Sequence, residues 1–75
     1  ILSYKGLLVE WSQKNKKSFE FQSFEDTGND TVKHFCAKFI LDNILVSKGR
    51  DTSKKKAEEK AARRAYYILQ KEINP

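Results

Sequence analysis

Residues 53–65 read Ser-Lys-Lys-Lys-Ala-Glu-Glu-Lys-Ala-Ala-Arg-Arg-Ala, and this stretch decides the fold more than any other. At about 100° per residue, its alanines fall within one arc of a helix, which Ile68 and Leu69 extend. The lysines stand at the start of that helix, where free backbone N–H groups and the helix dipole favour an anion. The stretch therefore predicts a closely packed helix whose basic N-terminal end suits a phosphate group. The alternative is an ordinary amphipathic helix with a solvated basic face.

The basic charge is confined to the C-terminal part of the chain. Residues 1–47 hold six Lys/Arg and six Asp/Glu, so their formal charges cancel. Residues 48–75 hold nine Lys/Arg and four Asp/Glu, which accounts for the whole formal net charge of +5. This uneven distribution indicates a polyanionic partner, either nucleic acid or an acidic membrane surface. Alanines in place of Leu or Trp on the apolar side of the helix disfavour the membrane surface.

The 75 residues suffice for one small domain, 1–75, with a marginal core in which five Phe, three Tyr and one Trp are available. No apolar run approaches the roughly 20 residues that span a bilayer, so no membrane partner is expected. The single cysteine, Cys36, cannot form an internal disulfide, which favours a reducing, cytoplasmic location. His34 lies two residues away, but two ligands do not make a zinc site, so no metal is expected. The chain begins at Ile1 and holds no Met, so we interpret it as a fragment of a longer protein.

Hydrophobic periodicity predicts a helix, three strands and a second helix. The first helix should run from about Tyr4 to Lys14 after an N-cap at Ser3. Alternating residues predict strands at 19–22, 34–41 and 44–46, with a turn at 27–30, a tight hairpin at 42–43 and a loop at 48–52. The second helix should be capped by Ser53 or Thr52 and run to about Lys71.

The predicted fold class is α+β, in the order α-β-β-β-α, with a three-stranded antiparallel sheet. Each helix has one apolar face, so both helices should pack on one face of the sheet, around Trp11, Phe35 and Phe39. The other face should remain in water, as antiparallel sheets permit. On the outer side of the second helix, most basic side chains should be solvated and one i,i+4 ion pair should form. The outer basic residues are Lys56, Lys60, Arg63 and Arg64, and the pair is Glu59 with Arg63.

The element order and the pattern Ser-Lys-Lys-x-Ala-x-x-x-Ala-Ala at 53–62 resemble the double-stranded RNA-binding domain (dsRBD) from Ser3 to about Lys71. Two segments are similar to bacterial ribonuclease III in particular: Leu-x-Glu-Trp-x-Gln at 8–13 and Ser-Lys-Lys-Lys-Ala-Glu at 53–58. The resemblance implies the substrate-binding C-terminal domain of such an enzyme. It implies double-stranded RNA as the partner and Mg²⁺ in a separate nuclease domain. It also implies a homodimeric parent enzyme and a monomeric isolated domain.

The resemblance implies RNA contacts in two minor grooves. In the first helix, Glu10 matches an acid that reaches ribose hydroxyls, and Gly6 and Gln13 lie on the same polar side. In the loop after the first strand, Gly28 and Thr31 correspond to a Gly-Pro-x-His sequence of the family. The usual His is therefore absent from this loop. Contacts to riboses and groove shape would carry little sequence information.

A third set of implied contacts is the group that binds phosphates across the major groove, which Ser53, Lys54 and Lys55 match. Two other positions depart from the family. Val9 stands where a Gln is common, and Asp51 stands where a second Gly is common and adds a negative charge near the phosphate site. These departures and Thr31 favour an alternative, a protein-interaction or dimerisation module of the same fold with weak or no RNA binding. The retained lysines favour RNA.

No catalytic site is expected within this chain. Metal-dependent cleavage of a phosphodiester needs clustered carboxylates around Mg²⁺. Asp26, Asp30 and Asp42 are instead expected in turns, and the chain has one His. Endonuclease activity, with hydrolysis of RNA during RNA processing, is therefore expected only of the parent protein.

Overall fold

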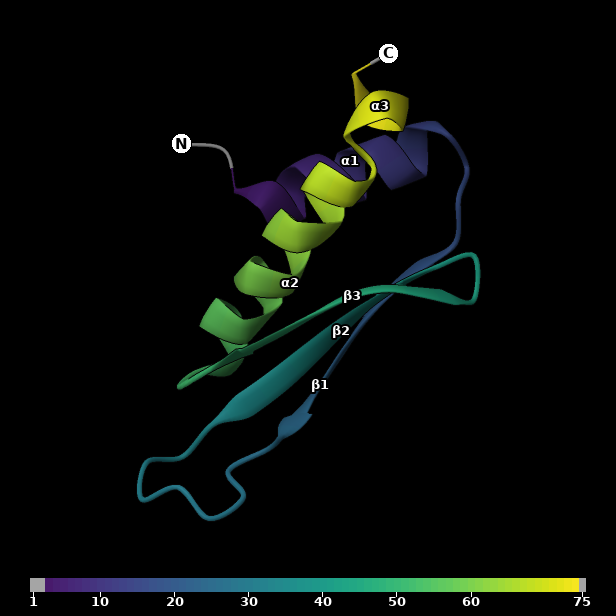
Figure 1. The fold of residues 1–75 in the computed structure, drawn as a ribbon. Helices are drawn as coiled ribbons and strands as arrows, with labels where there is room; N and C mark the ends of the chain where they lie inside the picture. The colour runs from purple at the N-terminus through teal and green to yellow at the C-terminus, as the bar shows by residue number, and fades with distance from the viewer. Residues whose placement is uncertain (1–2, 75) are drawn as a thin grey trace.

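The computed structural model describes residues 3–74, which form three helices and three strands in the order α1, β1, β2, β3, α2, α3 (Figure 1). The helices are α1 (Tyr4–Lys14), α2 (Lys54–Ile68) and the short α3 (Gln70–Ile73). The strands β1 (Phe19–Glu25), β2 (Phe35–Leu41) and β3 (Ile44–Asp51) form an antiparallel sheet in the order β1-β2-β3. The predicted α-β-β-β-α fold is confirmed. Within residues 3–74, no helix is long and apolar enough to cross a membrane.

Both major helices begin at the predicted serine caps. The Ser3 hydroxyl accepts a hydrogen bond from the backbone N–H of Gly6 at 3.0 Å. The Ser53 hydroxyl accepts one from the N–H of Lys56 at 3.1 Å. Each bond satisfies a backbone donor that the first turn of a helix leaves without an intrahelical partner. These caps fix the first residue of each helix.

The predicted tight hairpin joins β2 to β3. Asp42 and Asn43 have positive φ angles of 49° and 66°, and the flanking Leu41 and Ile44 pair with each other. Two consecutive positive φ angles are typical of the two-residue turn whose twist matches the strands on either side. The turn therefore sets the register of β2 against β3 as far as Ile40, beyond which a bulge at Val46 shifts the pairing by one residue.

The second helix and the strands differ in length from the prediction. β1 continues to Glu25 instead of ending at residue 22, and β2 begins at Phe35 instead of residue 34. β3 continues through residues 48–51, so the predicted loop there was wrong. These residues look like a loop because alternate polar side chains face water, while the backbone pairs with β2. α2 ends at Ile68, and α3 follows after Leu69 in place of one helix to Lys71.

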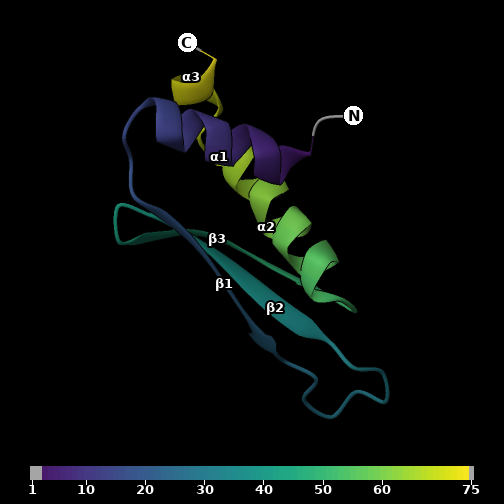
Figure 2. The same cartoon turned by 180° about the vertical axis from the view of Figure 1, so that it is seen from behind.

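The helices cover one face of the sheet, as predicted (Figure 2). Leu8 from α1 and Phe39 from β2 are fully buried in one cluster, which the alanines Ala62 and Ala65 of α2 complete together with Leu41. A second cluster joins Ala37 of β2 to Ala57 and Ala61 of α2, with Phe35 packed against it. Trp11 packs at the margin of the first cluster. The alanine stripe therefore lies where the sequence predicts it.

Gly49 of β3 explains how closely α2 approaches the sheet. A Cβ atom at this position would lie 2.6 Å from the carbonyl oxygen of Ala57 and 2.6 Å from the nitrogen of Ala61. Both atoms belong to the α2 backbone, so neither can rotate away. Nearby, the buried Ser47 hydroxyl donates a hydrogen bond to the carbonyl of Ala61 at 2.6 Å. Helix and strand are thus in backbone contact, which only glycine at this position permits.

The opposite face of the sheet is not covered by any described helix (Figure 2). Cross-strand rows on this face place Gln22 beside Lys38 and Lys38 beside Lys48. A second row places Phe24 beside Cys36 and Cys36 beside Arg50. Cys36 is buried and free, although it lies on the open face. This second row lies near the loop that joins β1 to β2, residues 26–34.

Candidate nucleic-acid interface

The first turn of α2 presents a concentrated positive charge. Ser53 caps the helix, and Lys54, Lys55 and Lys56 are all exposed. Within residues 3–74, no carboxylate lies at ion-pair distance from these three ammonium groups. Free lysines beside the positive end of a helix dipole form a site for an anionic group. Ser53, Lys54 and Lys55 are therefore brought together as the sequence predicts.

Phe35 links this first turn to the loop between β1 and β2. The Lys54 ammonium lies 5.9 Å from the centre of the Phe35 ring, and that of Lys33, from the loop, lies 5.5 Å from it. Cations at this range are attracted to the face of an aromatic ring. Lys33 is thus a candidate site residue that the sequence analysis missed. Its only sequence signal is a lysine just before a strand that begins with an aromatic residue.

The exposed side of α1 carries the polar residues predicted to touch RNA. Gly6, Glu10 and Gln13 are all exposed, whereas Leu8 and Ser12 on the other side are buried. A Cβ atom on Gly6 would lie 3.2 Å from the capping Ser3 hydroxyl, which is a tight contact. The predicted polar side of the helix is confirmed as the surface side.

Two acids of α2 hold the start of α1 in place. Glu58 accepts hydrogen bonds from the Lys5 ammonium at 3.0 Å and from the Ser23 hydroxyl at 2.9 Å, so it joins α2 to α1 and β1. Burial alone would raise the pKa of Glu58, but these two bonds, together with the positive charges of Lys5 and Lys54, lower the pKa below its usual value. Glu59 accepts the backbone N–H of Tyr4 at 2.6 Å. The predicted ion pair of Glu59 with Arg63 is absent from the described residues, because Glu59 caps α1 instead.

The loop between β1 and β2 carries Gly28 and Thr31, both exposed. Gly28 has a φ of 60°, which glycine adopts without strain. Arg50 of β3 donates two hydrogen bonds to the carbonyl of Asp26, from Nε at 3.2 Å and from Nη2 at 3.0 Å, and Nη2 also bonds the carboxylate of Asp30. The hydrogen bond from Arg50 lowers the pKa of Asp30. Arg50 therefore holds the loop through Asp26 and Asp30, and the sequence analysis did not include it among the site residues.

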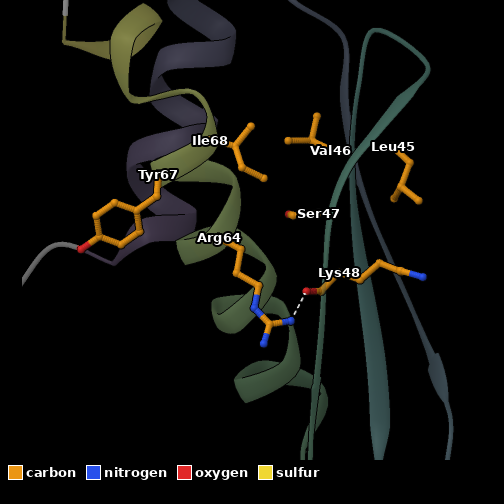
Figure 3. Close-up of a pocket in the computed structure, with 7 residues that line it drawn as sticks. All are labelled: Leu45, Val46, Ser47, Lys48, Arg64, Tyr67 and Ile68. Carbon is orange, nitrogen blue, oxygen red and sulfur yellow. Dashed lines mark hydrogen bonds between the residues drawn. The ribbon is translucent and has the colours of Figure 1, made fainter.

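Most of the outer basic residues of α2 are exposed, as predicted, but Lys60 and Arg64 also make hydrogen bonds that the sequence did not predict. Lys60 donates to the carbonyl of Arg50 at 2.9 Å, and Arg64 donates to the carbonyl of Lys48 at 2.7 Å (Figure 3). These carbonyls lie on β3, the edge strand next to α2, where the ladder offers no partner. α2 lies so close to β3 that these two outer cations reach the edge of the strand.

Asp51 does not leave an uncompensated negative charge near the lysines. Its carboxylate accepts the backbone N–H of Thr52 at 2.6 Å and lies 3.3 Å from the Lys60 ammonium. The bond from Thr52, with a smaller contribution from Lys60, lowers the pKa of Asp51. The charge is therefore balanced by Lys60, which itself lies outside the first turn.

A shallow groove of about 600 Å³ opens beyond Arg64, between β3 and the C-terminal half of α2 (Figure 3). Val46 and Ile68 face each other across it, while the Lys48 side chain points away from the helix. The groove lies away from the lysines of the first turn. Within residues 3–74, no group of three or more His, Cys, Asp or Glu is placed to hold a metal ion.

The three predicted contact regions follow one another along the longest dimension of the molecule, which is 43 Å. The β1–β2 loop lies at one end, the first turn of α2 comes next, and α1 lies beyond it (Figure 1). This order matches the sequence of surfaces that a groove-spanning protein would present.

Comparison with known proteins agrees with this geometry. Residues 4–69 match the family described as "Double-stranded RNA binding motif". The chain is 57% identical over 74 residues to Ribonuclease 3 of Zunongwangia profunda and 46% identical over 74 residues to Ribonuclease 3 of Flavobacterium psychrophilum. Each match covers 99% of this chain and 30% of the relative, so the chain spans about a third of the length of these proteins.

Solved structures show the same fold. The solution structure of the second dsRBD of HYL1 has a TM-score of 0.70 and 28% identity, covering 89% of this chain and 97% of that one. The solution structure of dsRBD2 of DRB4 has a TM-score of 0.72 and 24% identity, covering 92% and 97%. With a family match over residues 4–69 and relatives up to 57% identical, the chain belongs to the double-stranded RNA-binding motif family.

Proposed function

We propose that this chain binds double-stranded RNA by its shape. In this proposal, α1 enters one minor groove through Gly6, Glu10 and Gln13. The β1–β2 loop enters a second minor groove through Gly28 and Thr31. The first turn of α2, with Ser53, Lys54 and Lys55, binds phosphates across the major groove between them. The observation that carries the proposal is the set of unpaired lysines in the first turn of α2, a helix that Glu58 and Glu59 join to the start of α1.

The physics of A-form RNA fits these surfaces. Its minor groove is wide and shallow and displays 2′-hydroxyl groups, whereas its major groove is too deep and narrow for side chains to read. A rigid body that touches two minor grooves and the intervening phosphates spans about 16 base pairs. Phosphate contacts supply affinity and make it depend on salt, while the 2′-hydroxyls distinguish RNA from DNA.

We further propose that the chain is the substrate-binding part of a cytoplasmic ribonuclease III-type enzyme. The support is the similarity to Ribonuclease 3 from two bacteria over 99% of this chain. In such an enzyme, Mg²⁺-dependent cleavage would belong to a separate nuclease domain and the parent would be a homodimer. This chain would supply the hold on the duplex.

A competition titration tests the proposal. The 75-residue chain should prefer an RNA duplex over a DNA duplex of the same sequence, because Glu10 and its neighbours meet ribose hydroxyls only in RNA. Glu10→Ala should narrow this preference. The matched control, Glu72→Ala, removes another exposed helical acid from α3 and should leave the preference unchanged. Equal affinity of the unaltered chain for the two duplexes would refute the proposal and favour the protein-interaction module.

A further inference from the structure

Arg50 is the basic residue of β3 whose side chain bonds the loop between β1 and β2. In the sheet register it lies beside Cys36 of β2, and Cys36 lies beside Phe24 of β1. From there its guanidinium reaches the carbonyl of Asp26 with two hydrogen bonds and lies 3.4 Å from the carboxylate of the same residue. Its Nη2 also bonds the Asp30 carboxylate. One side chain thus fixes two points of the β1–β2 loop.

Apart from Arg50, the loop is held by hydrogen bonds and ion pairs that all lie within residues 25–34 of the described chain. Among them, the Thr27 hydroxyl accepts a hydrogen bond from the backbone N–H of His34 at 3.1 Å, and the His34 ring lies 3.5 Å from the Asp30 carboxylate. No contact within the described loop joins it to the rest of the sheet as Arg50 does.

The loop is not stiffened by its composition. It contains no proline, since the only proline of the chain is Pro75. Its base is closed by the Asp26 N–H on the carbonyl of His34 at 2.8 Å, and a turn forms where the Asp30 N–H bonds the carbonyl of Thr27 at 3.1 Å. Gly28 lies inside the turn from Thr27 to Asp30, Thr31 lies between that turn and His34, and both are exposed. A glycine in such a segment increases the freedom that must be lost on binding.

The charges lead to the same conclusion. Asp26 and Asp30 lie in a loop that is proposed to enter a groove lined by phosphates, where free carboxylates would be repelled. Arg50 lies against both, and its hydrogen bond to Asp30 is charge-assisted at both ends. In this geometry the guanidinium is directed at the loop, so it is not available as a separate phosphate contact.

We propose that Arg50 is a positioning residue for duplex RNA binding, which acts by fixing the β1–β2 loop through Asp26 and Asp30. This inference rests on the proposed RNA-binding function. A loop held in its bound shape loses less freedom on binding, so Arg50 increases affinity without touching RNA. If Arg50 were only one more positive charge in the basic region, its effect on binding would follow the net charge alone.

The sign of one charge change separates the two readings. Asp30→Asn raises the net charge by one, so a purely electrostatic role predicts tighter binding to RNA. Loop positioning predicts weaker binding, by about three- to tenfold, because the pair with Arg50 is lost. Arg50→Gln should weaken binding to a similar extent. The double variant restores the original net charge, yet it should bind no better than Arg50→Gln alone.

The experiment measures the affinity of the 75-residue chain for an RNA duplex of about 20 base pairs, long enough to reach both minor grooves. The matched control is Glu72→Gln, which removes an equal charge from exposed α3. Asp30→Asn should bind more weakly than this control. Binding as tight as the control, or a double variant that recovers the original affinity, would overturn the inference. Thermal unfolding of each variant checks that the fold is intact.

A second measurement needs no RNA. Backbone order parameters from NMR relaxation should fall for residues 27–33 in both Arg50→Gln and Asp30→Asn and remain unchanged in Glu72→Gln. Unchanged loop order in both variants would contradict the positioning role even if the chain bound RNA well. If the unaltered chain failed to prefer RNA while the loop lost order as expected, the proposed function would be wrong and the loop contact would stand.

Discussion

The first turn of α2 and the two turns that follow it use the same kind of side chain for different purposes. Lys54 and Lys55 are exposed and meet no carboxylate among the described residues. Lys60 and Arg64 lie on the same helix but donate to backbone carbonyls of β3. The difference lies in what each side chain faces, since Lys60 and Arg64 reach carbonyls of β3, whereas Lys54 and Lys55 have no such partner among the described residues. A count of basic residues therefore overstates the charge that is available to a ligand.

The largest change expected in this comparison comes from Gly49→Ala. Its Cβ atom would collide with the α2 backbone at 2.6 Å, so helix and strand would have to separate. Overpacking of this kind costs about 3 kcal/mol in the free energy of unfolding, and the bonds of Lys60 and Arg64 to β3 would weaken with it. Chemical denaturation measures the loss. Stability equal to that of the unaltered chain would show that α2 does not need backbone contact with β3.

A smaller effect is expected when Lys60→Gln and Arg64→Gln are combined. Each loses an exposed hydrogen bond to β3, and Lys60→Gln also loses the ion pair with Asp51, so the free energy of unfolding should fall by about 1 kcal/mol per site. The control is the pair Lys48→Gln and Lys71→Gln, which removes the same charge from exposed side chains without described ion pairs. Equal stability of the two double variants would mean that capping of the strand edge contributes nothing.

The smallest effect concerns two buried hydroxyls, one in α1 and one in β3. Ser12 in α1 is fully buried, and its Oγ has no hydrogen-bond partner within residues 3–74, whereas the buried Ser47 donates to Ala61. Ser12→Ala should therefore stabilise the chain by about 1 kcal/mol, because a buried donor without a partner is costly and alanine favours helix. Ser47→Ala should destabilise it by about the same amount. Thermal unfolding of the two single variants measures both changes in stability. A loss of stability in Ser12→Ala would contradict the prediction and point to a bound water at that hydroxyl.

The parts of the fold that depend on local sequence could be predicted. The bounds of α1, the caps at Ser3 and Ser53 and the hairpin turn at Asp42 and Asn43 all follow from short-range rules. The alanine stripe was also predicted correctly, because its spacing requires a helix with one small-residue face.

The remainder depends on contacts between distant segments. Residues 48–51 read as a loop because Gly49 has no side chain and its neighbours are polar. The reason for that glycine is the helix lying on it, which no local pattern reveals. The same applies to three other residues. Arg50 bonds a residue 24 positions away, Glu58 bonds residues 35 and 53 positions away, and Lys60 bonds a residue 10 positions away. Charge and spacing identify such residues as basic or acidic, but only the packed structure determines which of them remain free.

The central claim is that the free lysines of the first turn of α2, and not basic charge in general, bind the RNA backbone. The direct test measures the affinity of the chain for duplex RNA at several salt concentrations. It compares the double variant that combines Lys54→Gln and Lys55→Gln with a control double variant that combines Lys48→Gln and Lys71→Gln. The account predicts that the first pair weakens binding to all duplex sequences alike and reduces the slope of log affinity against log salt by about one for each lost contact. It predicts little change in that slope for the control pair. Equal losses of affinity and slope in the two double variants would contradict the account, because generic charge would then explain the binding.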